Sequence, residues 1–102
     1  MSEWVYFLHP PRENFAATMT NDEVAAWNRH FEWLGTLVEK GVLVLAGATG
    51  GATNTGIAIC EEADEESARR TVANDPAATG GYARGELCSF EMGLLRGRRP
   101  RD

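Results

Sequence analysis

His30 and Asp75 are the two residues of the chain whose side chains could form an acid–base pair. Histidine is the side chain that gains or loses a proton near neutral pH without help from its surroundings. A carboxylate that reaches one ring nitrogen would fix the tautomer of the imidazole and leave the other nitrogen as a general base. The two residues lie far apart in the chain, so a fold must bring them together.

Each residue of this pair also has a structural reading. His30 lies within a long helical segment, where a hydrogen-bonded histidine at the edge of a core is common. Asp75 precedes Pro76, which pushes it out of the helical region of backbone space and marks the end of a helix. An aspartate there can simply cap the following turn. The sequence therefore leaves both readings open.

Three further residues are candidates for binding a substrate. His9 ends an apolar segment, Arg12 carries a planar guanidinium that suits a carboxylate, and Trp33 adjoins His30 as a possible pocket wall. His9, His30 and Asp75 are possible metal ligands by type, but their positions carry no ligand-spacing signature. We therefore predict no metal site and no cofactor.

The chain pattern predicts four strands and two helices. The expected strands span residues 4–9, 42–46, 56–60 and 84–92, and residues 47–55 form a glycine-rich hairpin loop. A capping box of Thr20 and Glu23 starts a helix that runs to about Lys40, and Gly41 stops it. Asp64 caps a second, shorter helix, and residues 76–82 are expected to form a loop. The order βαββαβ predicts an α+β, ferredoxin-like plait with both helices on one face of an antiparallel sheet.

The first helix carries two adjoining apolar stripes. The longer stripe is expected to face the core, and it consists of Val24, Trp27, Phe31, Leu34 and Val38. The neighbouring stripe holds His30, Trp33 and Leu37, so His30 is predicted to lie beside the core face.

Composition limits the functions that the chain can have. Its formal net charge is −5, its last seven residues contribute +3, and residues 1–95 therefore carry −8. An acidic body argues against nucleic acid as a partner. No apolar segment is long enough to span a bilayer, and Cys60 and Cys88 suggest buried free thiols, so we expect a cytoplasmic protein. One domain is predicted over residues 1–95, followed by a solvated basic tail at 96–102.

The first two strands predict an oligomer. Residues 4–8 and 42–46 are apolar on both faces of their strands, whereas two helices can cover only one face of a sheet. A second copy packed sheet to sheet would cover the other face. We therefore predict a homodimer, with a cleft where a helix and the sheet edge diverge.

These features together resemble the YciI-like (YCII-related) family of the dimeric α/β-barrel superfamily, similar in fold to muconolactone isomerases. The resemblance is carried by His30, Leu34 and Gly41, by VLVLAG (42–47), GIAIC (56–60) and ESARR (66–70), and by Asp75-Pro76 with Gly80-Gly81. It implies a ferredoxin-like dimer with an active site at His30 and Asp75. The chain departs from the family pattern at Ala48, where proline is usual, and at Ala77, where a bulky apolar residue is usual. Both changes are expected to widen or reshape the pocket.

The resemblance implies cofactor-free elimination or isomerisation of a small ring or carbonyl compound. In that reading His30 is the general base and Asp75 accepts a hydrogen bond from its other ring nitrogen. The alternative is a non-catalytic dimeric module that binds a small molecule or a protein partner, in which the pair serves structure alone.

Overall fold

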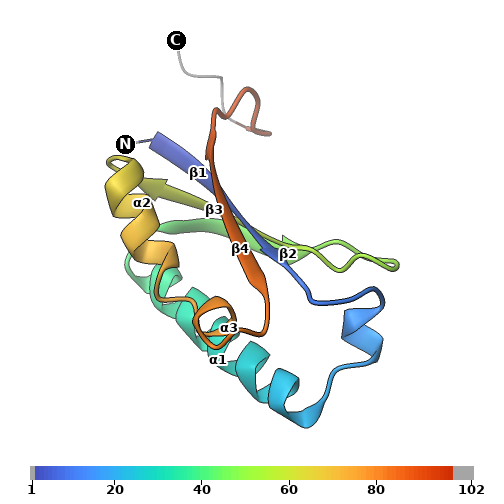
Figure 1. The fold of residues 1–102 in the computed structure, drawn as a ribbon. Helices are drawn as coiled ribbons and strands as arrows, with labels where there is room; N and C mark the ends of the chain where they lie inside the picture. Colours follow the sequence, from blue (N-terminus) through green and yellow to red (C-terminus); the bar gives the residue numbers. More distant parts are fainter. Residues whose placement is uncertain (1, 98–102) are drawn as a thin grey trace.

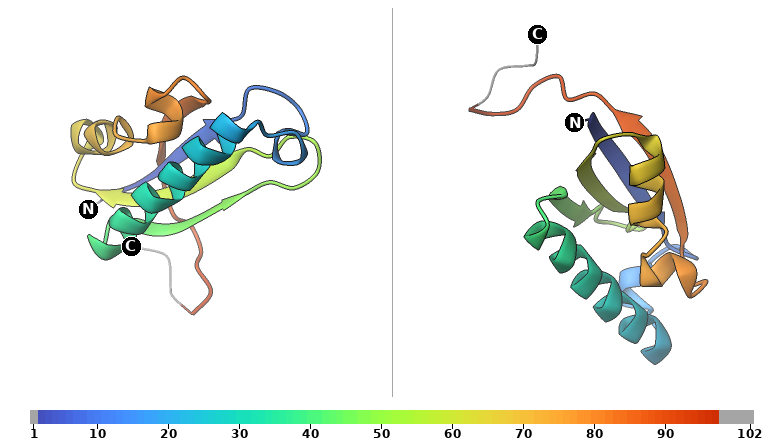
Figure 2. Two further views of the ribbon diagram at one scale, coloured as in Figure 1. Left: turned by 90° about the horizontal axis from the view of Figure 1, so that it is seen from below. Right: turned by 90° about the vertical axis from the view of Figure 1, so that its left-hand side faces the viewer.

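The computed structural model describes residues 2–97, and it forms one antiparallel sheet with every helix on the same face (Figure 1, Figure 2). The strands are β1 (Ser2–His9), β2 (Leu43–Ala48), β3 (Gly56–Glu62) and β4 (Arg84–Phe90). The helices are η1 (Phe15–Ala17), α1 (Asn21–Glu39), α2 (Glu65–Val72) and α3 (Pro76–Thr79). The strand order is β2-β3-β1-β4 with antiparallel neighbours, so the predicted ferredoxin-like plait is confirmed.

Local signals in the sequence set the ends of the helices. Thr20 and Glu23 form the predicted capping box at the start of α1, and Gly41, at a φ of 73°, follows its end. The Asp64 side chain accepts a hydrogen bond from the Ser67 amide and caps α2. These contacts depend only on residues a few positions apart, which is why the sequence predicted them.

Helix α1 buries a different face from the one that its longer apolar stripe predicted. Val24, Phe31 and Val38 are 42, 64 and 60% exposed. The buried residues of the helix are Glu23, Ala26, His30, Leu34 and Leu37. The prediction was wrong because two adjoining stripes satisfy the helical period equally well, and only the contact with the sheet selects one. His30 therefore lies on the core face itself.

The segment 76–82, predicted as a loop, begins with the short helix α3. The Asp75 side chain caps this helix by accepting a hydrogen bond from the Ala77 amide at 3.0 Å. Pro76 occupies its first turn, where a proline needs no amide hydrogen and has a suitable φ. The last strand ends at Phe90, so Met92 lies beyond it. Residues 98–102, and with them most of the predicted basic tail, lie outside the described residues.

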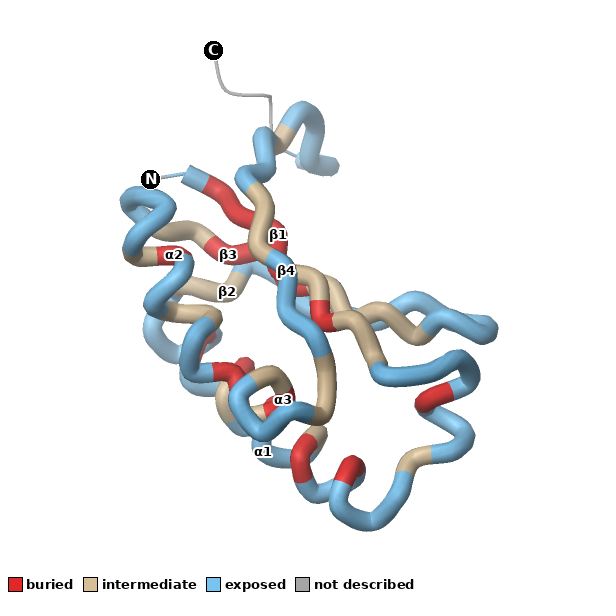
Figure 3. Tube along the Cα trace, in the orientation of Figure 1, coloured by how far each residue is buried: buried red, intermediate tan, exposed pale blue. Residues whose placement is uncertain are grey.

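The core lies between the helices and the sheet, as the burial pattern shows (Figure 3). Its buried members are Tyr6, Leu8, Leu34, Leu37, Ala58 and Ala77. Both cysteines are free; Cys60 is buried and Cys88 is half-buried. Burial raises the pKa of the Cys60 thiol to about 11. Within residues 2–97, no helix is long and apolar enough to cross a bilayer.

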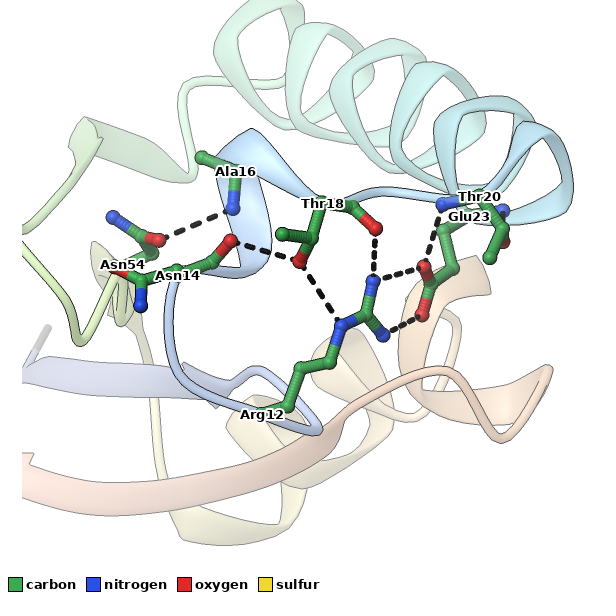
Figure 4. A network of polar contacts seen from close by, with 7 residues as sticks. All are labelled: Arg12, Asn14, Ala16, Thr18, Thr20, Glu23 and Asn54. Atoms are coloured by element: carbon green, nitrogen blue, oxygen red, sulfur yellow. Dashed lines mark hydrogen bonds and ion pairs between the residues drawn. The ribbon is translucent and has the colours of Figure 1, made fainter.

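Arg12 ties the segment after β1 to the start of α1 (Figure 4). Its guanidinium donates two hydrogen bonds of 2.8 Å to the Glu23 carboxylate and one of 3.1 Å to the Thr18 hydroxyl. The same carboxylate accepts a hydrogen bond from the Thr20 amide at 2.8 Å. The donation from Arg12 is the main reason that the pKa of Glu23 falls to about 2.

We expect Glu23→Gln to lower the melting temperature at pH 7, because the neutral amide loses the charge-assisted bonds to Arg12. A carboxyl whose folded-state pKa is lowered stabilises the fold above its ordinary pKa, and this stabilisation disappears as it becomes protonated. The difference in melting temperature between variant and wild type should therefore become smaller as the pH falls from about 4.5 toward 2. Thermal melts followed by circular dichroism across that range measure it.

Glu66→Gln is the matched control, because Glu66 forms an exposed ion pair with Arg70. Exposed pairs of this kind contribute little to stability. A melting-temperature difference for Glu23→Gln that stays constant from pH 7 to pH 2 would contradict the assignment.

Candidate active site

Asp75 is fully buried, at 0% exposure, and its carboxylate accepts three hydrogen bonds. Oδ1 accepts from His30 Nδ1 at 2.8 Å and from the Ala77 amide at 3.0 Å, and Oδ2 accepts from the Tyr6 hydroxyl at 2.7 Å. The donors come from α1, α3 and β1. Burying a carboxylate is costly unless it is paired and hydrogen-bonded, and this carboxylate receives its hydrogen-bond donors from three elements of the fold.

The contact with Asp75 sets the tautomer of His30. An ionised carboxylate can only accept hydrogen bonds, so Nδ1 of the imidazole carries the proton and Nε2 of the neutral ring is left unprotonated. Within residues 2–97, every buried side-chain nitrogen or oxygen has a hydrogen-bond partner. Nε2 of His30 has no such partner in that range, so it is not one of the buried atoms. It is therefore accessible to solvent, although His30 as a whole is only 7% exposed.

Tyr6 is held against Asp75 by the packing of β1 and β4. Burial, followed by the hydrogen bond to Asp75, raises the pKa of the phenol well above its ordinary value, so the hydroxyl stays a neutral donor. Gly85 of β4 leaves room for this ring, because a Cβ at that position would lie 2.6 Å from the Tyr6 hydroxyl oxygen. The edge of the Tyr6 ring also contacts Trp33, with centroids 6.1 Å apart.

A cavity of about 460 Å³ lies between α1 and the strands β2 and β3, and His30 is one of its walls. On the sheet side, four of the lining residues are small, namely Ala46, Ala48, Gly56 and Ala58, and the larger Tyr6, Leu8 and Leu43 lie on the same face. On the helix side, the walls are Trp27, His30, Phe31, Leu34, Gly35 and Val38. A long helix that crosses a floor of small side chains leaves a gap, and this gap has the volume of an ordinary small-molecule site.

The cavity is closed at one end by the β2–β3 hairpin. Asn54, at a φ of 54°, donates from its side-chain amide to two hairpin carbonyls and accepts from the Ala16 amide at 3.1 Å. The Asn14 amide also donates to the Ala52 carbonyl at 2.7 Å. These bonds join the hairpin tip to the η1 segment and hold Asn54 at the cavity wall.

The structure places the other candidate residues outside this cavity. The guanidinium of Arg12 is engaged by Glu23 and Thr18, so it is not free to hold a substrate carboxylate there. His9 pairs with Glu86 at 2.8 Å at the C-terminal end of β1 and does not line the cavity. Trp33 packs behind the imidazole, at 5.7 Å between ring centroids. Within residues 2–97, no three His, Cys, Asp or Glu side chains gather as metal ligands.

The sequence reasoning missed the role of Tyr6, which it treated as part of an apolar strand. Alternation along β1 indicates that Tyr6 and Leu8 share a face, but no local signal shows that the hydroxyl reaches Asp75. Of the two departures from the family pattern, Ala48 lines the cavity, whereas Ala77 is buried in the core. Of these two positions, only Ala48 contributes directly to the cavity wall.

Comparisons with known proteins identify a family and a similar fold. The YCII-related domain family model matches residues 4–91. Among solved structures, the fold is similar to that of the 5-chloro-2-hydroxyhydroquinone dehydrochlorinase of Burkholderia phenoliruptrix AC1100, solved in complex with 2,5-dihydroxybenzoquinone. That match has a TM-score of 0.67 at 18% identity and covers 91% of this chain and 96% of the other. A search of curated proteins found no significant match.

At 18% identity the structural similarity establishes a common fold and nothing more. The family model, however, spans β1 to β4 and includes Tyr6, His30 and Asp75. The resemblance noted in the sequence is thereby confirmed, and the chain belongs to the YCII-related domain family.

Proposed function

We propose that the protein is a cofactor-independent lyase or isomerase in which His30 is the general base for a small ring or carbonyl compound. The observation that carries this proposal is the unpartnered Nε2 of His30, a residue that lines the cavity and whose Nδ1 is bound by Asp75. A positioned base of this kind typically contributes about 10²–10⁴ in rate.

In the proposed step, Nε2 removes a proton from a carbon next to a carbonyl or from a ring hydroxyl. The electron pair of the broken bond moves into the ring or toward the carbonyl oxygen. In an elimination the leaving group then departs with its bonding pair, and in an isomerisation the imidazolium returns the proton to another carbon. Asp75 stabilises the imidazolium across the 2.8 Å bond to Nδ1.

The structural neighbour supports an elimination, because its name describes the loss of hydrogen chloride from a chlorinated ring. The second candidate is a binding module without catalysis. It is favoured by the composition of the cavity, whose walls are mostly apolar and offer one side chain suited to moving a proton near neutral pH. Turnover of a probe compound separates the two.

We expect His30→Gln to reduce halide release from 5-chloro-2-hydroxyhydroquinone by about 10²–10⁴ relative to wild type. Glutamine can still donate to Asp75 but cannot take up the proton. A chloride-sensitive assay measures the rate. The control is Asn28→Gln, a substitution at an exposed position of α1. Equal rates for His30→Gln and wild type would contradict catalysis by His30. Saturable binding of the compound without chloride release from wild type would favour the binding module.

We expect Tyr6→Phe to destabilise the fold by about 1–3 kcal/mol, because Oδ2 of the buried Asp75 loses its hydrogen-bond donor. Tyr82→Phe is the matched control, since the Tyr82 hydroxyl makes no hydrogen bond with a residue in the described range and Tyr82 is only half-buried. The free energy of unfolding of Tyr82→Phe should stay within about 0.5 kcal/mol of the wild-type value. Urea unfolding followed by tryptophan fluorescence gives both values. Equal losses for the two variants would rule out a special role for Tyr6.

We also propose that two copies pair through the sheet face opposite the helices. The strand register brings Leu45, Ile59, Val5 and Cys88 into one row across that face. Val5 and Ile59 are already buried in the single chain, whereas Leu45 and Phe90 are 53 and 41% exposed. Sheets that pack face to face bury apolar rows of this kind.

We expect Phe90→Glu to shift the protein from dimer to monomer in sedimentation velocity at micromolar concentration, because it buries a charge at the proposed interface. Phe31→Ser is the control, since Phe31 is also an exposed phenylalanine but lies on α1. A wild-type protein that sediments as a monomer would remove the proposal. Dissociation by Phe31→Ser and not by Phe90→Glu would move the interface to the helices.

A further inference from the structure

The walls of the cavity carry no formal charge of their own. Among the described residues, its lining includes no Asp, Glu, Lys or Arg, and its titratable side chains are those of His30 and Tyr6. The Tyr6 hydroxyl is occupied by Asp75 and remains neutral. A ligand in this cavity therefore meets the imidazole of His30, and no guanidinium or ammonium group.

A negatively charged ligand would be disfavoured here for two reasons. It would lose its hydration in an apolar site with no cation to compensate, which is costly. It would also lie near the carboxylate of Asp75, which is one imidazole ring away behind His30. Arg12 cannot relieve this, because its guanidinium is bound by both oxygens of Glu23.

A positively charged ligand cannot pair directly with Asp75, because both carboxylate oxygens already accept hydrogen bonds and the residue is fully buried, and a cation would also lose its hydration against apolar walls. The side chains that line the cavity favour a flat molecule. The sheet side of the cavity includes the small residues Ala46, Ala48, Gly56 and Ala58 beside Tyr6 and Leu8. Its helix side presents the aromatic rings of Trp27 and Phe31, whose centroids lie 6.2 and 5.7 Å from that of His30. Flat rings pack well against such surfaces.

We propose that this cavity selects an uncharged ring compound and rejects the same ring when it carries a carboxylate. The inference rests on the proposed function only in taking the cavity as the substrate site. It adds the charge of the substrate: the compound enters neutral, and a negative charge arises only as His30 removes the proton and becomes positive.

The test compares 4-hydroxybenzamide with 4-hydroxybenzoate, which have the same ring and hydroxyl and nearly the same shape but differ in charge. Titration of isotope-labelled protein, followed by amide NMR shifts, measures each affinity and locates the binding. We expect the amide to shift resonances of α1 and β2 around the cavity and to bind at least about tenfold more tightly than the carboxylate. Equal or tighter binding of 4-hydroxybenzoate would overturn the inference, as would shifts by 4-hydroxybenzamide confined to another surface.

Phe31→Lys provides the second arm, because it places a cation at the mouth of the cavity. It should reduce the preference for 4-hydroxybenzamide severalfold or reverse it. Asn28→Lys makes the same charge change on an exposed position of α1 that does not line the cavity, and it should leave the preference unchanged. Equal effects of the two variants would show that overall charge, rather than the cavity, sets the selectivity.

The two proposals fail separately. His30→Gln tests catalysis by halide release and should leave the preference for the uncharged compound in place, because glutamine is also uncharged. If the protein shows no preference for the uncharged compound but its turnover still depends on His30, only the inference about charge is removed. Selective binding without turnover would remove only the catalytic proposal.

Discussion

The burial of the Asp75 carboxylate is the constraint on which the arrangement of the site depends. A carboxylate removed from water must find hydrogen-bond donors inside the protein, since leaving it unpaired costs several kcal/mol. Here the donors are a phenol from β1, an imidazole from α1 and the amide of Ala77 in α3. One charged group therefore links three elements that lie far apart in the chain, and it orients the histidine at the same time.

The same constraint explains details that look unrelated in the sequence. Helix α3 begins at Pro76 and is capped by the Asp75 side chain, and this start directs the carboxylate inward. Gly85 has no side chain, so the Tyr6 ring can lie across β4 and reach Asp75. Because the imidazole is tethered through Nδ1, its other nitrogen is left without a protein partner. The chemistry available to His30 is thus a consequence of how a buried charge is satisfied.

The cavity has a separate origin, in the sizes of the residues that face one another. Part of the sheet side consists of alanine and glycine, whereas the exposed Phe31 and Val38 line the cavity from the helix. Apolar residues that would be expected in a core instead form the mouth of the cavity. Leu8 and Leu34 belong both to the cavity wall and to the core that they form with Leu37. The bonds between Arg12 and Glu23 stabilise the start of α1.

The sequence by itself determined what depends on neighbouring residues: the capping box at Thr20, the stop at Gly41, the Asp64 cap, and the element order that implies a ferredoxin-like sheet. It also supplied the two residues, His30 and Asp75, that are compatible as a pair. It did not identify the buried face of α1, the short helix α3, or the role of Tyr6. Those outcomes depend on contacts between distant segments. The helical period allows two faces, strand alternation does not say which side meets the helices, and only the tertiary structure brings Tyr6 within 2.7 Å of Asp75.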